Sequence, residues 1–403
     1  MKIGIIKEGK VPPDFRVALT PKQCRSIIDN FSNVEVFIQK SPIRTYSDAQ
    51  YEAEGLPLVD TLEHCDVIIG VKEVNLDDLI PNKTFMFFSH TFKKQSYNRV
   101  LLQEILNKNI RLIDYEVIKD ERNVRLIGFG RYAGIVGCYN GFRTYGLKHK
   151  LYNLKPANEC QDRKEVEAEL KKVKLPNDFK MVLTGFGRVG HGAREIMNLL
   201  PIREVKPYTY LNKSFSGPVF THLEVENYFD KKDGSEFIRS EFYNQPELYK
   251  RGFQKYVPES DMYIPCHYWS SRSPKILTQK DLSNVDNRIS VVADISCDIA
   301  DPIASTLRPS KVAHPIYGYD PISGKEVDFM QENAIAVMAV DNLPCELPKD
   351  ASEDFGNELI KHVLPALVGD DTKRIIERAS QTNLNGELMP DFTYLKDYVE
   401  GNE

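Results

Sequence analysis

The chain has 403 residues, which exceeds one compact core and predicts two domains, since single cores stop growing at roughly 250–300 residues. Its formal net charge of −5, from 53 Lys and Arg against 58 Asp and Glu, offers no basic face and argues against a nucleic-acid partner. The N-terminus lacks the apolar region of a signal peptide, and no run approaches the ~20 apolar residues of a membrane span, so we expect a cytoplasmic protein without a membrane partner. The seven cysteines form no C-x-x-C pair, so neither a zinc site nor a disulfide scaffold is expected.

Short apolar runs alternate with helical patterns in the first third of the chain. Thr20 and Pro21 predict the start of a helix, because they offer an N-cap hydroxyl and a proline at the first helical position. A second helix is expected at residues 97–107. Strands are predicted at residues 3–7, 34–39, 67–71, 85–88 and 110–114. This βαβ order predicts a parallel sheet buried on both faces, and a first α/β domain over residues 1–137.

A glycine-rich turn organises the second domain, after a long linking helix at residues 130–147. An apolar strand is expected at residues 180–184, and Gly185, Gly187 and Gly190 follow it with G-x-G-x-x-G spacing before an amphipathic helix. The first glycine permits a tight turn, the second lets backbone N–H groups approach a pyrophosphate, and the third lets the helix pack on the strand. Strand, glycines and helix occur in the order that dinucleotide binding requires. This order favours a cofactor site over a glycine-rich turn in some other βα unit.

Further strands are expected at residues 204–210, 261–265, 290–295 and 334–340. A C-terminal helix is expected to start with a capping box at residues 350–353, and its apolar face requires cover from the first domain. The predicted fold class is α/β, with two Rossmann-like doubly wound parallel-sheet domains and a cleft between them. The expected substrate domain is discontinuous, residues 1–137 with 342–403, and the expected dinucleotide-binding domain is 138–341.

Two strands of the first domain are each followed by a titratable side chain, Lys72 in one case and His90 in the other. Both are expected at the carboxyl edge of the sheet, where parallel sheets hold ligands. From position alone, a solvated lysine at a strand end is about as typical as a functional one, and composition alone favours a structural histidine. Their parallel placement favours proton transfer, since a desolvated lysine titrates near ~7–8 and histidine titrates near neutral pH unaided. Arg16 and Gln95 add carboxylate-binding capacity.

The blocks around these residues resemble known families. Arg16-Val-Ala-Leu-Thr-Pro21 resembles the opening motif of the alanine dehydrogenase/transhydrogenase superfamily. Later blocks are similar to lysine-forming saccharopine dehydrogenases, and most closely to the lysine-ketoglutarate reductase half of bifunctional lysine-degrading enzymes. These blocks are Ile68-Ile-Gly-Val-Lys72-Glu, Phe87-Phe-Ser-His90-Thr-Phe, Leu112-Ile-Asp-Tyr-Glu116, Gly128-Phe129-Gly130, Cys266-His-Tyr268-Trp, Ala293-Asp294-Ile-Ser296 and Val340-Asp341-Asn-Leu-Pro344.

The resemblance implies an NAD(P)-dependent oxidoreductase that interconverts L-lysine, 2-oxoglutarate and NAD(P)H with saccharopine and NAD(P)+. It implies that Lys72 and His90 are the acid/base pair. The substrate-binding positions that it implies are Arg16, Gln95, Phe129, Glu73 and Glu116, of which the two glutamates are also placed to tune Lys72. The cofactor-binding positions expected from the glycine turn and the resemblance are Gly185, Gly187, Arg188, Val189, Gly190, Gly192, Thr209, Lys213, Tyr268, Asp294, Ile295, Ser296, Asp341 and Leu343.

The form of the cofactor depends on one strand end. No Asp or Glu ends the strand expected at residues 204–210, where an NAD-specific site places an acid on the ribose 2′-OH. Arg188 and Lys213 are nearby cations, so NADP(H) is favoured and NAD(H) stays open. An alanine dehydrogenase-like enzyme and a non-catalytic nucleotide-binding regulator are the alternatives, and the retained lysine, histidine and glycines argue against the regulator. The oligomeric state is left open.

Overall fold

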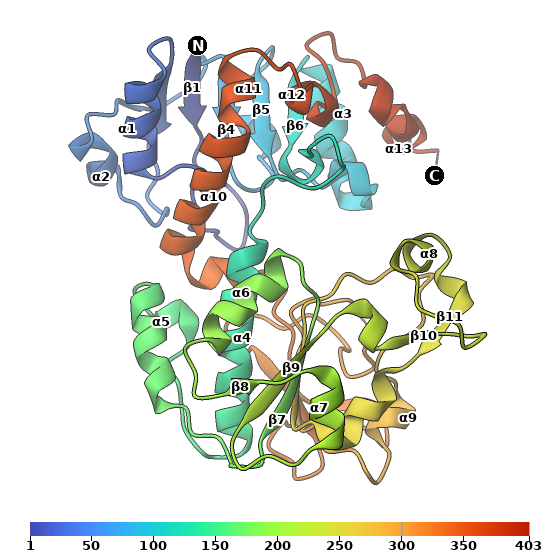
Figure 1. Cartoon of the computed structure of the whole chain (residues 1–403). Coiled ribbons are helices and arrows are strands. Elements are labelled where there is room, and N and C mark those ends of the chain that lie inside the picture. The colour runs from blue at the N-terminus through green and yellow to red at the C-terminus, as the bar shows by residue number, and fades with distance from the viewer. Residues whose placement is uncertain (300, 403) are drawn as a thin grey trace. The chain divides into compact units, whose positions relative to one another are not determined.

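The computed structural model describes residues 1–299 and 301–402, so residue 403, the end of the expected substrate domain, lies outside the described residues. The chain divides into two compact units (Figure 1). One comprises Met1–Phe129 with the segment from Pro348 onward, and the other is Gly130–Leu347. The boundaries expected at 137/138 and 341/342 are therefore displaced.

Helix α4 (Gly130–Lys148) and the turn η10 (Leu343–Glu346) explain this displacement, because both pack within the second unit. A Cβ atom on Gly134 would lie 1.9 Å from the Val189 carbonyl oxygen, so α4 passes very close to α6 (Arg188–Met197). Asn140 of α4 donates a hydrogen bond of 2.9 Å to Glu346 of η10. The linking helix is thus a structural part of the nucleotide unit.

The first unit contains a six-stranded sheet in the order β3-β2-β1-β4-β5-β6, and all neighbouring strands are parallel. The strands are β1 (Lys2–Ile5), β2 (Glu35–Gln39), β3 (Leu58–Val59), β4 (Val67–Ile69), β5 (Thr84–Phe87) and β6 (Arg111–Asp114). The predicted parallel sheet is confirmed. The sequence does not predict β3, because a strand of 2 residues is too short to show a pattern.

Helix α1 shows how the local sequence determines the helices of this unit. Thr20 caps it, the Thr20 and Gln23 side chains form a capping box, and Pro21 occupies the first turn. The other helices of this unit are α2 (Asp48–Ala53), α3 (Arg99–Asn107), α10 (Pro348–His362), α11 (Leu364–Val368), α12 (Ile375–Ala379) and α13 (Lys396–Glu400), and α1 itself spans Pro21–Asn30.

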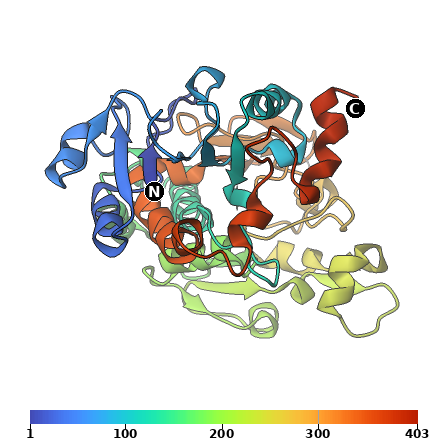
Figure 2. The same cartoon turned by 90° about the horizontal axis from the view of Figure 1, so that it is seen from above.

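The C-terminal segment completes the core of the first unit. Phe355 and Leu359 of α10 are buried in the same apolar cluster as Ile27 of α1. Gln23 Nε2 donates to the Glu353 carbonyl oxygen at 2.8 Å, which fixes α10 against α1. Further along the chain, α13 lies beside α3 (Figure 2). Two segments of the chain that are about 220 residues apart in the sequence therefore form one compact unit.

The second unit contains an eight-stranded sheet in the order β15-β14-β16-β13-β12-β7-β9-β8. The strands from β16 to β8 are parallel, and β14 and β15 add an antiparallel edge. The strands are β7 (Lys180–Thr184), β8 (Arg203–Glu204), β9 (Val219–Leu223), β12 (Met262–Pro265), β13 (Val291–Ala293), β14 (Ile316–Asp320), β15 (Lys325–Val327) and β16 (Ile335–Met338). A separate hairpin pairs β10 (Phe229–Lys231) with β11 (Tyr249–Arg251).

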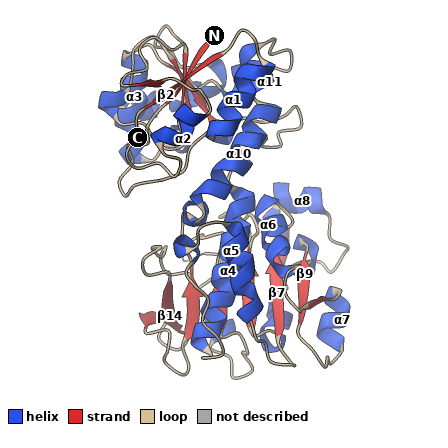
Figure 3. Cartoon of the chain, turned by 90° about the vertical axis from the view of Figure 1, so that its left-hand side faces the viewer, coloured by secondary structure: helices blue, strands red, loops and turns tan. Residues whose placement is uncertain are grey.

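Helices cover this sheet in a Rossmann-like arrangement. Helix α4 crosses one face and contacts β12, β13 and β16 (Figure 3). The remaining helices are α5 (Arg163–Glu169), α7 (Pro207–Asn212), α8 (Arg239–Asn244) and α9 (Gln279–Leu282). Over residues 1–299 and 301–402, no helix is long and apolar enough to cross a membrane.

The strand expected at residues 204–210 is wrong over most of its length. Strand β8 ends at Glu204, and α7 begins at Pro207, whose ring favours the first turn of a helix over a central strand. Strand β7 pairs with β12 on one side and with β9 on the other, and the sequence pattern left β9 inside an irregular segment. This correction changes which side chain ends the strand next to the glycine turn.

Candidate active site

The carboxyl edge of the first sheet brings together four predicted site residues. Lys72 and Glu73 follow β4, His90 follows β5, and Glu116 follows β6. Because β4, β5 and β6 are consecutive parallel neighbours, their carboxyl ends lie side by side. The sequence-based placement of Lys72 and His90 on adjacent strand ends therefore holds in the structure.

Backbone geometry at His90 is unusual. Its φ of 55° lies in the left-handed region, which costs energy for a residue with a side chain. The buried Asp114 carboxylate compensates by accepting hydrogen bonds from the Ser89 N–H at 2.9 Å and the His90 N–H at 3.1 Å. The Ser89 hydroxyl donates to the same oxygen at 2.5 Å. Asp114 thus holds His90 in a strained turn, as functional sites often require.

Glu73 determines which nitrogen of His90 carries hydrogen. Its Oε1 lies 2.7 Å from His90 Nδ1, and its Oε2 accepts from the Lys10 ammonium at 2.9 Å. Burial raises the pKa of Glu73, but the hydrogen bonds from His90 and Lys10 outweigh burial and lower the pKa to about 2. Because an ionised carboxylate only accepts, Nδ1 must be the donor. Nε2 is therefore the nitrogen that can exchange a proton.

Glu116 lies near the other ring nitrogen of His90. Its Oε2 lies 3.8 Å from His90 Nε2 and 2.7 Å from the Lys93 ammonium, and its Oε1 accepts from Arg125 at 3.3 Å. Burial raises the pKa of Glu116, but Lys93, Arg125 and His90 together lower it, so the group stays ionised. Glu73 and Glu116, expected to tune Lys72, therefore contact His90 directly.

Lys72 has an environment suited to proton transfer. Burial lowers its pKa to about 8, and the positive charges of Arg16 and Lys10 act in the same direction. Asp14 and Glu73 oppose this effect. Near neutral pH the side chain is mainly the ammonium, with a neutral fraction that rises toward pH 8. It can therefore both donate and accept a proton.

Arg16 is held rigidly inside the first unit and is only 1% exposed. Its Nε and Nη2 donate to the two Asp14 carboxylate oxygens at 2.9 and 2.6 Å, and its guanidinium lies 4.2 Å from the centre of the Phe129 ring. Burial raises the pKa of Asp14, but the bonds from Arg16 outweigh it and hold the pKa well below its usual range. Gln95 has a different partner, since its Oε1 accepts from the Tyr97 hydroxyl at 2.5 Å. A substrate clamp by Arg16 stays a prediction.

The glycine turn of the second unit shows a different requirement at each position. Gly185 has a φ of 93°, and a Cβ there would lie 2.4 Å from the Cys266 carbonyl oxygen. A Cβ on Gly190 would lie 1.9 Å from the Gly185 oxygen, and one on Gly192 would lie 1.9 Å from the Arg131 oxygen of α4. Gly187, at the N-cap of α6, would meet no atom within 4 Å. Packing therefore explains three glycines, whereas Gly187 leaves open space for an approaching ligand.

The structure gives the surroundings of the other residues expected at the cofactor, whose roles there stay predictions. Thr209 lies in α7 and Lys213 directly follows it, and this helix follows the edge strand β8, which β9 separates from β7. Asp294 is fully buried and accepts hydrogen bonds from Ser296 Oγ and Thr306 Oγ1, each at 2.6 Å, so it holds a loop together. Arg188 and Val189 lie next to the glycine turn, in the first turn of α6. The other expected positions follow strands of the same sheet: Tyr268 after β12, Ile295 after β13, and Asp341 and Leu343 after β16.

The sequence pattern did not reveal the acid that follows β9, one of the two strands that pair with β7. Glu224 comes directly after β9, and its Oε2 accepts from Arg239 Nη2 at 2.6 Å. On the same strand, His222 Nε2 lies 2.7 Å from the Gly185 oxygen, and its ring stacks on Phe186 of the glycine turn at 3.6 Å. The available signal was the short run at residues 219–223, which follows Gly-Pro and is followed by Glu224.

Comparisons with known proteins agree with the α/β fold described above. Residues 4–136 match the family described as alanine dehydrogenase/PNT, N-terminal domain. The saccharopine dehydrogenase (NAD+, L-lysine-forming) of Yarrowia lipolytica is 26% identical, over 94% of this chain and 95% of that protein. These similarities support the assignment of the chain to the alanine dehydrogenase/transhydrogenase superfamily. A solved structure of L-alanine dehydrogenase superposes with a TM-score of 0.66 at 18% identity, covering 99% of this chain and 100% of that one.

One relative is much longer than this chain. The α-aminoadipic semialdehyde synthase of Arabidopsis thaliana is 30% identical over 400 residues, which make up 89% of this chain and 37% of that protein. The chain thus spans less than half the length of such relatives.

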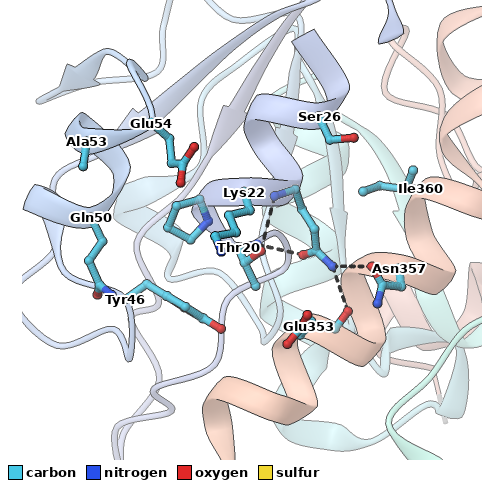
Figure 4. Close-up of a pocket in the computed structure, with 12 residues that line it drawn as sticks. Thr20, Lys22, Ser26, Tyr46, Gln50, Ala53, Glu54, Glu353, Asn357 and Ile360 are labelled. Carbon is cyan, nitrogen blue, oxygen red and sulfur yellow. Dashed lines mark hydrogen bonds between the residues drawn. The ribbon is translucent and has the colours of Figure 1, made fainter. Parts of the chain in front are cut away.

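A pocket of about 640 Å³ lies on the first unit between α1, α2 and α10 (Figure 4). Its lining includes Lys22, Tyr46, Glu54 and Glu353, and none of the predicted site residues. The residues predicted for the chemistry therefore lie outside the lining of this pocket. Within the described part of the chain, no group of three His, Cys, Asp or Glu side chains is placed to hold a metal ion.

Proposed function

We propose that this chain is a nicotinamide-dependent oxidoreductase that interconverts L-lysine plus 2-oxoglutarate with saccharopine. The observation that carries the proposal is the pair of adjacent strand ends, with Lys72 at a pKa of about 8 and His90 oriented by Glu73. The supporting likeness is to saccharopine dehydrogenases, which align over nearly the whole chain.

The reaction needs proton transfers that these two residues can perform. The lysine amine adds to the 2-oxoglutarate ketone to give a carbinolamine, which loses water to form an imine. The amine nitrogen must give up protons and the departing hydroxyl must receive one. His90 Nε2 is available to accept a proton, and the Lys72 ammonium is available to donate one. A bound NAD(P)H supplies the hydride that reduces the imine carbon.

The glycine turn fits a dinucleotide, with Gly187 opening space at the N-terminus of α6 for the pyrophosphate. Our sequence-based preference for NADP(H) depended on the absence of an acid at the end of the strand beside β7. That strand is β9, and Glu224 follows it. A carboxylate there hydrogen-bonds a ribose 2′-OH and repels a 2′-phosphate. We therefore propose NAD(H) as the preferred cofactor, and Arg239, which pairs with Glu224, as the group that could receive a 2′-phosphate.

An alanine dehydrogenase-like activity is the second candidate. The match of residues 4–136 to the alanine dehydrogenase/PNT family favours it. The two candidates share the acid/base groups and differ in the size of the substrate that they accept.

A substrate panel separates these activities. NADH oxidation is followed by absorbance with lysine plus 2-oxoglutarate in one arm and ammonia plus pyruvate in the other. We expect turnover in the first arm, and loss of that turnover in Lys72→Met. Turnover only with ammonia and pyruvate would establish the second candidate, and turnover in neither arm, by a protein that binds NADH, would refute both.

A further inference from the structure

Glu8 is a buried carboxyl group at the edge of the first sheet that no step above uses. It is 9% exposed and lies just beyond β1. Its Oε1 accepts from the Val71 N–H at 2.7 Å, and its Oε2 accepts from the Lys72 N–H at 2.9 Å. Strands β1 and β4 are neighbours, and their last ladder bond runs from Ile6 N to the Ile69 oxygen. Beyond the last backbone hydrogen bond between β1 and β4, the Glu8 side chain thus accepts the next two N–H groups, including that of Lys72.

A charged side chain is a costly way to satisfy two backbone N–H groups. Burial raises the pKa of Glu8 to about 7, although both hydrogen bonds and Arg16 act to lower it. On the other side of β1, the neutral Gln39 performs the corresponding task, since its Oε1 accepts from the Lys7 N–H at 3.1 Å. A neutral acceptor therefore suffices at the end of β1, and the carboxylate at Glu8 needs another reason.

The surroundings of Glu8 supply this reason. The charged groups that act on the Glu8 carboxyl are Asp14 and Arg16 before α1, and Lys72 binds it through its backbone N–H. The Glu8 charge in turn acts on Tyr115 in η4 (Tyr115–Val117). The buried Tyr115 hydroxyl has no hydrogen-bond partner among the described residues, and burial followed by the Glu8 charge raises its pKa. Every one of these groups belongs to the first unit, around the proposed proton-transfer residue.

We propose that Glu8 is a positioning residue for Lys72, whose carboxylate fixes the backbone at Lys72 and whose charge favours the ammonium form of that side chain. The inference rests on the proposed function, in which Lys72 is an acid/base group. Both Glu8 oxygens are bound to the backbone, so Glu8 does not contact substrate. When Glu8 takes up a proton near pH 7, one oxygen becomes a donor and one of the two N–H groups loses its acceptor. Lys72 is then held less firmly.

The test is Glu8→Gln, with Gln39→Ala as the matched control at the opposite side of β1. The substitution leaves one oxygen acceptor and removes the charge. We expect kcat to fall roughly 10- to 100-fold, because displacement of a reacting group by about 1 Å has that effect. KM and the cofactor Kd should stay within about twofold, and the limb of the pH–rate profile that Lys72→Met removes should move to lower pH. Gln39→Ala should match the wild type in all of these measurements.

A second measurement is independent of the enzyme's substrates. The rate at which acetic anhydride modifies Lys72 is followed against pH by mass spectrometry of the Lys72 peptide. In Glu8→Gln the apparent pKa of Lys72 should fall by about half a unit, because a nearby negative charge is lost. This result tests the role of Glu8 even if the proposed reaction proves wrong.

A wild-type kcat together with an unchanged modification profile in Glu8→Gln would overturn the inference. If that variant does not fold, Glu8→Asp carries the test, since it keeps the charge and withdraws the acceptors. Glu8→Asp should lose kcat while the modification profile of Lys72 stays as in the wild type. Full activity in Glu8→Asp would contradict the positioning role.

Discussion

Replacing Glu73 by glutamine tests whether the orientation of His90 matters for catalysis. The Glu73 carboxylate accepts from His90 Nδ1 at 2.7 Å and is 15% exposed, so solvent screens the contact little. A hydrogen bond to a charged partner contributes about 1.5–3 kcal/mol. If that contribution is lost only in the transition state, kcat falls ~10- to 100-fold. An amide can also present its NH₂ group to the histidine, which then no longer has a fixed tautomer.

The same substitution has a predictable effect on stability. Lowering the Glu73 pKa from 4.5 to about 2 corresponds to about 3 kcal/mol of preference for the ionised form in the folded state. Because the pKa is lowered on folding, this stabilisation is fully present above pH 4.5 and is lost as the pH falls through about 2. The free energy of unfolding of the wild type should therefore decline more steeply than that of Glu73→Gln in this acidic range.

The assay is the pH dependence of kcat and kcat/KM, with Glu358→Gln as the control. Glu358 pairs with His362 at 3.7 Å on α10, so the control removes a second glutamate–histidine pair of the same unit. The control should keep wild-type kinetics. In Glu73→Gln, kcat should fall by the factor given above, because His90 Nδ1 loses its charged acceptor. A wild-type kcat and pH profile in Glu73→Gln would refute the assignment of Nε2 as the exchanging nitrogen.

Three other predictions follow from the same geometry. Gly187→Val should abolish cofactor binding in a fluorescence titration while the Tm stays near that of the wild type, whereas Gly190→Val should prevent folding because its side chain would meet the Gly185 oxygen. Lys72→Met and His90→Gln should each lower kcat by ~10²–10⁴ with unchanged cofactor affinity, and a rise in KM alone would make them binding groups. Glu224→Ala should improve NADPH binding relative to NADH, and an unchanged ratio of the two Kd values would exclude this residue from cofactor selection.

Apolar runs that end at titratable residues were sufficient to predict the catalytic edge of the first sheet. The runs before Lys72 and His90 are short, buried strands in consecutive positions, so their order along the chain gives their order in space. The glycine spacing likewise predicted a turn that the packing of Gly185 and Gly190 requires. In both cases the signal is local, because backbone pairing and glycine conformation act within a few residues.

The strand beside β7 could not be found in the same way. Strand β9 carries polar residues such as Thr221 and His222, although all of its residues are buried, and it lies in a long segment rich in aromatic residues. Its burial depends on contacts from both sides, with β7 and β8. Partners brought together by tertiary structure decide such a strand, so the sequence pattern placed it wrongly and missed Glu224 with it.

The carboxylates behind the reactive side chains were missed for a related reason. Glu8, Asp14 and Asp114 look like ordinary surface acids in the sequence, yet each is buried. Their common task is to hold a cationic or titratable residue in place: Glu8 binds the amide of Lys72, Asp114 binds the amide of His90, and Asp14 binds the guanidinium of Arg16. Burying an acid destabilises the fold unless its bonds compensate, so three such acids at one sheet edge are hard to explain by stability alone. A site that must hold Lys72, His90 and Arg16 in fixed positions, as the proposed function requires, accounts for all three acids.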